Sequence, residues 1–515
     1  MENAPIVVQW IELGILICLF LFAVCAPHSI AATQTAWLVG MTLWVGRRFI
    51  YPPPQTYRTP LDYALLGFFI ITGLAALFSY EPMVSAGKLR AASLFTIVYL
   101  FVENIPSGKV LRMLALTLVA SCMINVAYTG ISRLIGRGVT LQTVRPDSPL
   151  SSAINVIGHQ RVPFPVIAGD TVLDVDEQRV RSAEDIAEAL GAGAGPPTAR
   201  VKIYRTEYMP TLLIPRGHLL SGTTAEQQLG IAGWSIGRDW RATGFYSHWV
   251  TYSQALMLIA SLALGLFIAL PQKRNRIALL LLIALAGLGL ALLLTVTRAS
   301  WLGFLVSAIV IVLAGTSRRT ILIVGLVLIP VVLAGFFILQ QQRHVGFVDQ
   351  KDASITWRQT VWHEGFALLI SKPRHLIIGV GMDSLKSHWR EWGLFDQGRI
   401  PIGHMHSDFL EIALERGVPA LILWLILLGL YARTLWQSLR RLRHQEPHDV
   451  AVDTFGPWID RGIVLGALGG LAGFVVSGVV HYNWGDSTVM MIFYFLMALS
   501  LVVHRQVGAE LNRHR

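Results

Sequence analysis

Long apolar stretches dominate the chain, and most of the connections between them are short and rich in arginine and lysine. A membrane-spanning helix needs about 20 mostly apolar residues, and the chain contains about twelve stretches close to that length. They lie near residues 9–27, 30–46, 61–80, 89–103, 110–131, 247–270, 277–297, 300–316, 320–340, 418–437, 461–481 and 487–504. The pattern predicts an all-α polytopic membrane protein.

The composition supports this prediction. Hydrophobic residues make up 54% of the chain and charged residues only 14%, and the mean hydropathy is +0.56. Such a chain is too apolar for one soluble domain and needs lipid as its solvent. The formal net charge of +11 could suggest nucleic acid. Because the basic residues occur in short clusters between apolar stretches, we expect them to orient the chain in a membrane and expect no nucleic-acid partner.

The basic clusters predict which connections face the cytoplasm. If each stretch crosses the membrane once, most clusters fall on one side, and the positive-inside rule makes that side cytoplasmic. They are Arg47/Arg48, Lys109, Lys273/Arg274/Arg276, Arg318/Arg319, Arg440/Arg441/Arg443 and the basic tail from Arg505 to Arg515. Both termini are then cytoplasmic, and two long insertions face the outer side of the membrane. The predicted division is 1–131 (helices one to five), 132–246 (first insertion), 247–340 (helices six to nine), 341–417 (second insertion) and 418–515 (helices ten to twelve and a cytoplasmic tail).

Three details refine the topology. Lys88 and Arg90 fall on the outer side and break the charge rule; a nearby anionic headgroup or diphosphate explains them, and so does interfacial snorkelling. The N-terminus has no basic region and no small-residue cleavage site, so we expect the first span to be retained. All three cysteines fall within spans, which predicts neither a disulfide framework nor a zinc cluster.

The first insertion has the pattern of a small folded α+β unit. Residues 168–175 alternate apolar and polar positions after a Gly-Asp turn, as a half-buried strand does. Ser182 and Asp185 are placed to cap a helix that ends at Gly191, and residues 200–204 and 211–215 resemble strands. This order, over about 140–220, resembles the second half of a bacterial PDZ domain. The resemblance implies a PDZ-like domain between spans five and six, which either binds a periplasmic peptide or protein or serves only as a cap.

Three short motifs recur at the outer ends of spans. Arg241 precedes Gly244 and His248 just before the sixth span, and Arg298 precedes Ser300 at the junction of spans seven and eight. His406-Ser407 lies before the tenth span, followed by a helical pattern that stops at Gly417. A guanidinium group stays charged and suits phosphate oxygens, and an imidazole exchanges protons near neutral pH. Each also has a simpler interpretation: Arg298 as a stop-transfer or capping residue, Arg241 as an interfacial anchor, and His406 as a solvated loop side chain.

Together these motifs resemble the signature of the O-antigen ligase and O-antigen polymerase superfamily. Further likenesses are Trp357-Arg358 with Trp362, Pro373 with Gly379 and Gly381, and His481 with Asp486. The resemblance covers the chain from about 240 to its C-terminus.

The resemblance implies a metal-independent glycosyltransferase without a cofactor. It would lie in a bacterial inner membrane, with residues 341–417 as its periplasmic catalytic loop. It would move a glycan from undecaprenyl diphosphate to an acceptor hydroxyl at the periplasmic face, with inversion of the anomeric configuration. His406 would be the general base, and Arg241 and Arg298 would stabilise the leaving diphosphate. Arg358, His248, His481 and Ser407 would contact substrate. The implied partners are the lipid-linked glycan, a lipid or glycan acceptor such as the lipid A core, and membrane lipids.

Several alternatives remain open from the sequence. Polymerisation of repeat units and transfer to protein hydroxyls share the same motifs as ligation. His404 and His406 could suggest a metal site, although a third ligand at a matching spacing is missing. A transporter would need ionisable groups near the middle of its spans, and a sensor or assembly factor built around the PDZ-like domain would not need His406.

Overall fold

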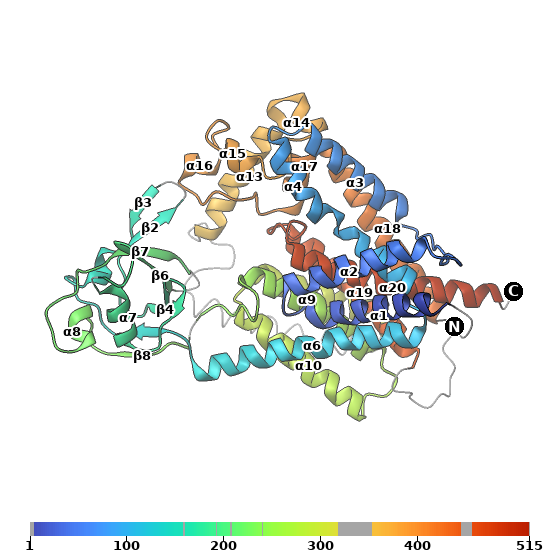
Figure 1. Cartoon of the computed structure of the whole chain (residues 1–515), viewed down its shortest axis with the longest axis horizontal. Helices are drawn as coiled ribbons and strands as arrows, with labels where there is room; N and C mark the ends of the chain where they lie inside the picture. Colours follow the sequence, from blue (N-terminus) through green and yellow to red (C-terminus); the bar gives the residue numbers. More distant parts are fainter. Residues whose placement is uncertain are drawn as a thin grey trace.

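The structure is a computed structural model that describes residues 5–157, 160–191, 193–205, 209–238, 240–317, 353–443 and 456–513. It consists of a helical bundle, a β-sheet module at one end and an arch of shorter helices beside the bundle (Figure 1). The module lies at the opposite end of the molecule from both termini. This arrangement agrees with a topology in which the termini and the first insertion lie on opposite sides of a membrane.

The N-terminal third forms helices where the apolar stretches predict them. These are α1 (Ile6–Cys25), α2 (Ile30–Arg48), α3 (Asp62–Leu77), α4 (Pro82–Ala92), η1 (Ser93–Phe95), α5 (Thr96–Asn104) and α6 (Gly108–Ile135). Serine side chains cap two of them: Ser29 accepts from the backbone N–H of Ala32, and Ser107 from that of Val110. The span expected at 89–103 begins earlier, at Pro82, because proline is favoured in the first turn of a helix. A single 3-10 turn, η1, interrupts this span.

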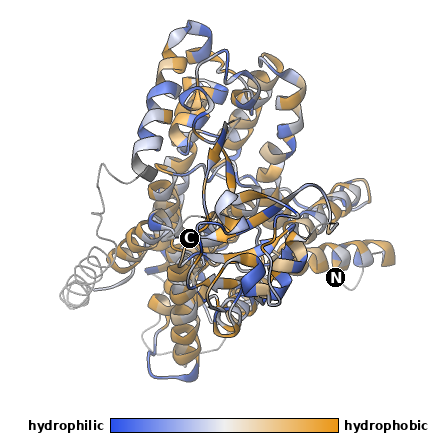
Figure 2. Ribbon diagram, turned by 90° about the vertical axis from the view of Figure 1, so that its left-hand side faces the viewer, coloured by the Kyte–Doolittle hydropathy of each residue, from blue (hydrophilic) through white to orange (hydrophobic). Residues whose placement is uncertain are grey.

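In the described ranges, the second half of the bundle contains six long helices, three of which pack closely together. Its long helices are α9 (Trp249–Ala269), α10 (Arg276–Leu294), α11 (Arg298–Gly315), α18 (Val418–Arg443), α19 (Trp458–Gly478) and α20 (Ser487–Arg513). Glycines let α9, α11 and α19 approach: a Cβ on Gly265 would lie 2.4 Å from the carbonyl oxygen of Gly462. Figure 2 shows apolar residues along the helices of this bundle.

Among the described residues, nine helical segments are long and apolar enough to cross a membrane. The protein is therefore a multi-pass membrane protein. Two predicted spans differ: α3 is shorter, and α2 is helical but lies outside this set of nine. The span predicted at 320–340 lies outside the described residues. The described part of the chain thus does not confirm the full count of twelve.

The first insertion contains one antiparallel sheet, in the order β3-β2-β7-β6-β4-β1-β8, with β5 paired to β4. The strands are β1 (Val139–Leu141), β2 (Ile154–Ile157), β3 (Gln160–Pro163), β4 (Thr171–Val175), β5 (Gln178–Arg179), β6 (Thr198–Tyr204), β7 (Thr211–Pro215) and β8 (Trp234–Ile236). Helices α7 (Ala183–Leu190) and α8 (Ala225–Leu229) accompany the sheet. It extends beyond 140–220 because β8 returns to pair with β1.

The predicted local features of the module are present. Ser182 and Asp185 form a capping box at the start of α7, and Gly191 follows its end. The Gly-Asp turn is fixed by Arg205, which donates to both carboxylate oxygens of Asp170 at 2.6 and 2.5 Å. These features establish the strands and the helix, while the likeness to a PDZ domain stays a prediction.

The second insertion folds into the arch. Its segments are α13 (Ala353–Ser371), α14 (Pro373–Ile377), α15 (Leu385–His388), α16 (Phe395–Gly398) and α17 (Asp408–Arg416). They share a small apolar core that includes Val361, Val380, Leu385, Met405 and Leu414. The arch contacts the end of α3, where Tyr80 donates its backbone N–H to the carbonyl oxygen of Val380 at 3.1 Å.

Candidate active site

A cavity of about 1520 Å³ lies where the arch, the α9 and α11 N-termini and the α19–α20 loop meet. Six of the seven residues predicted for the site line it, although they are spread over more than 200 positions of sequence. They are Arg241, His248, Arg298, Arg358, His406 and His481.

The seventh residue, Ser407, does not line the cavity. Its side chain is 7% exposed and accepts a hydrogen bond from the backbone N–H of Leu410, which caps α17. Its local bond is therefore structural, and a substrate contact by Ser407 has no support in the structure. The predicted stop of α17 at Gly417 also has a structural basis, since this residue has a φ of +85° and a Cβ there would lie 2.3 Å from the carbonyl oxygen of Ile377.

His406 has an unusual backbone conformation with a φ of +51°, which few non-glycine residues adopt. The preceding residue is held on both sides: Met405 donates its N–H to Glu411 at 2.5 Å, and Trp362 donates its indole N–H to the Met405 carbonyl oxygen at 2.8 Å. The ring of Trp357 meets the imidazole edge to face at 4.6 Å. Hydrogen bonds to the preceding residue and the Trp357 ring thus hold this backbone and the imidazole in place.

The surroundings keep the His406 imidazole neutral. Burial is the main cause that lowers the pKa of His406 well below its ordinary value, and His404, His481, Arg358 and His248 add to the effect. Its Nδ1 atom has no hydrogen-bond partner within the described part of the chain. A neutral, fixed imidazole in a cavity can accept a proton from a bound hydroxyl group.

The neighbouring histidines are neutral for the same reason. Burial lowers the pKa of His404 to about 4, of His248 to about 4 and of His481 to about 3. His404 lies against His406 with ring centroids 4.0 Å apart, and its Nδ1 accepts the His406 backbone N–H. His248 caps α9 by accepting from Val250.

Arg241 joins two of the predicted motifs. Its guanidinium donates to the carbonyl oxygens of Thr295, at 3.1 Å, and Val296, and lies over the ring of Trp249 at 4.8 Å. Burial, together with the positive charges of Arg298 and Arg358, lowers its pKa to about 10, so it is still protonated at neutral pH. Several guanidinium groups thus gather in one partly buried place, which favours an anion there.

Arg298 is the first residue of α11, whereas α10 ends at Leu294. A stop-transfer or C-capping arginine would lie at the end of a helix. A cation at a helix N-terminus faces the positive end of the helix dipole, and a bound anion would relieve both charges. This position favours the anion-binding interpretation of Arg298.

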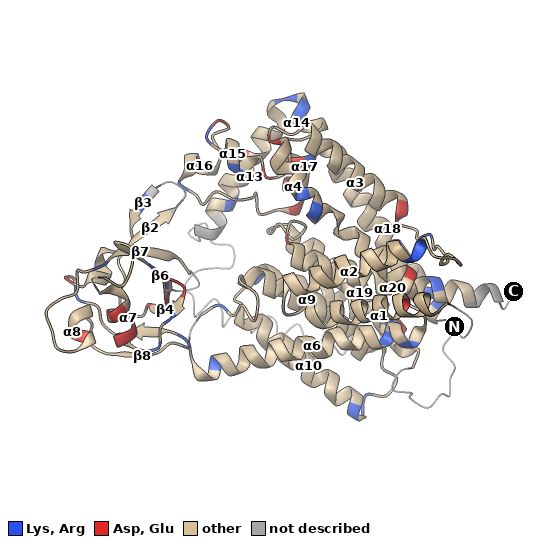
Figure 3. Cartoon of the chain, in the orientation of Figure 1, with Lys and Arg blue, Asp and Glu red and all other residues tan. Residues whose placement is uncertain are grey.

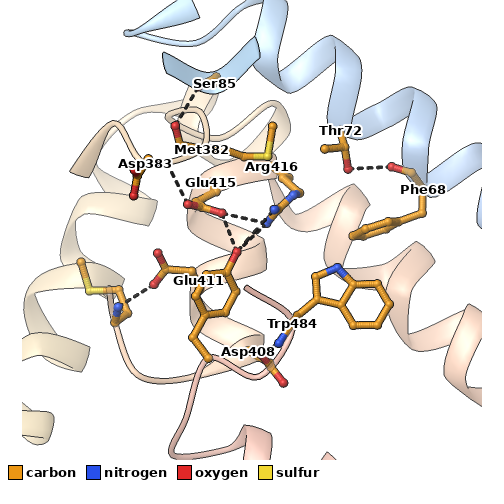
Figure 4. A network of polar contacts seen from close by, with 12 residues as sticks. Phe68, Thr72, Ser85, Met382, Asp383, Asp408, Glu411, Glu415, Arg416 and Trp484 are labelled. Atoms are coloured by element: carbon orange, nitrogen blue, oxygen red, sulfur yellow. Dashed lines mark hydrogen bonds and ion pairs between the residues drawn. The ribbon is translucent and has the colours of Figure 1, made fainter. Parts of the chain in front are cut away.

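Three buried acidic residues of α17 are site features that the sequence analysis missed (Figure 4). Asp408 accepts from the backbone N–H of Trp484 at 2.8 Å, and Glu415 pairs with Arg416 at 2.8 Å. Burial, with the nearby Glu415 charge, raises the pKa of Glu411. The only sequence signal was three acids on a helix with an apolar face, which alone does not distinguish a solvated face from a buried network.

The histidine pair has no metal site around it in the described ranges. Within them, no group of three or more His, Cys, Asp or Glu side chains is arranged to hold a metal ion. His404 and His406 therefore have no third ligand of these types at hand.

Comparison with known families places this geometry in context. Residues 283–425 match the family described as O-antigen ligase, a segment that contains Arg298, Arg358 and His406. Arg241, His248 and His481 lie outside the matched segment. No curated protein matches the chain. The match over residues 283–425 supports the likeness of the chain to the O-antigen ligase superfamily.

Proposed function

We propose that the protein is a membrane glycosyltransferase that moves a glycan from undecaprenyl diphosphate to an acceptor hydroxyl group at the periplasmic face. The observation that carries the proposal is that Arg241, Arg298 and His406, from three separate segments, line one cavity at the N-terminal ends of the bundle helices α9 and α11. The long lipid of the donor would lie in the membrane, with its diphosphate at the arginines.

In the proposed reaction, the acceptor oxygen attacks the anomeric carbon of the glycan. The acceptor proton moves to His406, the new glycosidic bond forms, and the bond from the anomeric carbon to the diphosphate oxygen breaks. The diphosphate takes the electron pair of that bond, and Arg241 and Arg298 stabilise its charge. Attack from the face opposite the diphosphate inverts the anomeric centre.

The acceptor decides between ligation and its alternatives. A lipid A core acceptor gives ligation, a second lipid-linked glycan gives polymerisation, and a protein hydroxyl gives protein glycosylation. The cavity chemistry is the same for all three, and ligation is our first choice because the matching family is described by that name.

The test is transfer by the purified protein from undecaprenyl-diphosphate glycan to each acceptor, with Arg298→Lys beside wild type. Lysine keeps the charge but loses the planar fork of donors, so we expect transfer to fall by about tenfold or more. Arg433→Lys, at an exposed position on α18, is the matched control and should leave the rate unchanged. Wild-type protein that releases no diphosphate with any acceptor would refute the proposal.

A further inference from the structure

Two lysines line the same cavity as Arg241 and Arg298. Lys88 lies on α4 and Lys386 on α15, and both ammonium groups contact the carboxylate of Asp383, at 2.9 and 2.7 Å. One carboxylate between two ammonium groups leaves one positive charge in excess. Figure 3 shows basic residues on α4 beside the arch, apart from the basic residues near the C-terminus. This explains in part why Lys88 departs from the positive-inside rule.

The group is held rigidly by its surroundings. Asp383 has a φ of +63°, and its backbone N–H donates to Glu415 at 2.9 Å (Figure 4). The preceding carbonyl group, of Met382, accepts from Ser85 on α4 at 2.9 Å. Buried bonds to α17 and α4 therefore fix the carboxylate that holds the two lysines, while each lysine side chain is about half exposed to the cavity, at 47%.

The lysines and the two arginines are held by different elements around the cavity. Lys88 and Lys386 contact Asp383, whose backbone N–H is bound by α17 of the arch. Arg241 instead donates to the loop between α10 and α11, and Arg298 begins α11 of the bundle. In Figure 1, α4 lies beside the arch, to which α15 belongs, whereas α9 lies in the bundle. Lys386 is also the charge with the largest effect on the pKa of His404, which places His404 near the lysines.

An inverting displacement requires the acceptor to approach from the side opposite the leaving group. If the diphosphate lies at Arg241 and Arg298, the acceptor lies on the side of His404 and the two lysines. We propose that Lys88 and Lys386, bridged by Asp383, form a binding site for an anionic group of the acceptor, a phosphate or carboxylate near the accepting hydroxyl. This inference rests on the proposed function for the direction of attack.

The test is a binding measurement on the full-length protein in nanodiscs, which does not depend on transfer. The probes are phosphorylated lipid A core and the same material after phosphatase treatment. Wild-type protein should bind the phosphorylated form roughly tenfold more tightly, and the double variant Lys88→Gln/Lys386→Gln should lose that preference while binding the donor as before. Arg90→Gln, on the same helix but outside the cavity lining, is the control and should behave as wild type.

Three outcomes would overturn the inference. These are equal binding of both forms by wild type, an unchanged preference in the double variant, or weaker binding of the donor instead. Repeating the measurement in nanodiscs of phosphatidylcholine and of phosphatidylglycerol tests whether the lysines bind a membrane lipid instead of the acceptor. If the anionic phosphatidylglycerol abolishes the preference for the phosphorylated core, the lysines bind lipid headgroups. A failed proposed function gives a different result, namely binding with the expected preference but no glycan transfer.

Discussion

The two long insertions are built by different means. The sheet module has its own apolar core and one antiparallel sheet that joins its strands by backbone hydrogen bonds. The arch has short helices, and the side chains of Glu411, Glu415 and Trp362 bond directly to its backbone. Of the eight non-glycine residues with positive φ in the described ranges, the arch holds five: Asp383, Phe395, Asp396, Gln397 and His406.

This difference teaches where the chain tolerates strain. An unfavourable backbone conformation persists only where surrounding contacts over-determine it, and such conformations gather at functional sites. In the arch, two of them, at Asp383 and His406, belong to residues that line the cavity. Among the described residues, none of the module lines the cavity, whereas the arch contributes several cavity-lining side chains.

The largest effect in this comparison is expected at Glu411. Glu411→Leu removes the acceptor for the Met405 N–H and releases the fixed loop, so kcat should fall about a hundredfold, as for other misplaced catalytic groups. Glu411→Gln keeps a carbonyl oxygen and should retain most of the rate. The measurement is steady-state transfer by folded, membrane-inserted protein.

The matched control is Glu364→Leu. Glu364 also holds strained backbone, accepting from Phe395 and Asp396 at 2.7 and 3.0 Å, but these two residues do not line the cavity. An equal loss of kcat in both leucine variants would mean that Glu411 acts through general stability rather than by placing His406.

A smaller effect is expected in the module, on stability and not on transfer. Residues 137–238 expressed alone should melt cooperatively, and Asp170→Asn should lower the free energy of unfolding by about 3 kcal/mol because it breaks a buried ion pair. Asp147→Asn, in the exposed pair with Arg145, should change it by less than about 1 kcal/mol. A segment without cooperative melting would contradict the independence of the module.

The smallest effect is expected from pH. Burial lowers the pKa of His406, so the neutral base is present above that pKa and is lost only as the pH falls through it. The kcat of wild type should therefore be flat from pH 8 down to pH 6, with the nearby His404 and His248 protonated only near pH 4. A half-loss near pH 6.5, the ordinary value for histidine, would show that the imidazole is solvated in the working enzyme.

Features set by neighbours in sequence could be predicted. The capping box of Ser182 and Asp185, the start of α17 at Ser407 and most bundle helices follow from local patterns and hydropathy. Features set by distant pairing could not. Strand β1 has three residues and is defined by its partner β8, nearly one hundred positions later.

The site divides in the same way. Residues of distinctive chemistry, Arg241, Arg298 and His406, could be selected from motifs and were found to line one cavity. Glu411 and the Lys88–Asp383–Lys386 group could not, because their roles depend on how the segments of the arch pack against one another and against α4. Ser407 was assigned to substrate although a local capping bond accounts for it.

The most direct test of the account is glycan transfer by His406→Ala, measured with purified protein and undecaprenyl-diphosphate glycan in the presence of EDTA. We predict that wild type keeps its activity under EDTA and that His406→Ala loses about a hundredfold to ten-thousandfold in rate while remaining folded and inserted. His218→Ala, an exposed histidine of the module, should match wild type. Near-normal transfer by His406→Ala would contradict its assignment as the general base, and loss of wild-type transfer under EDTA would contradict the metal-independent mechanism.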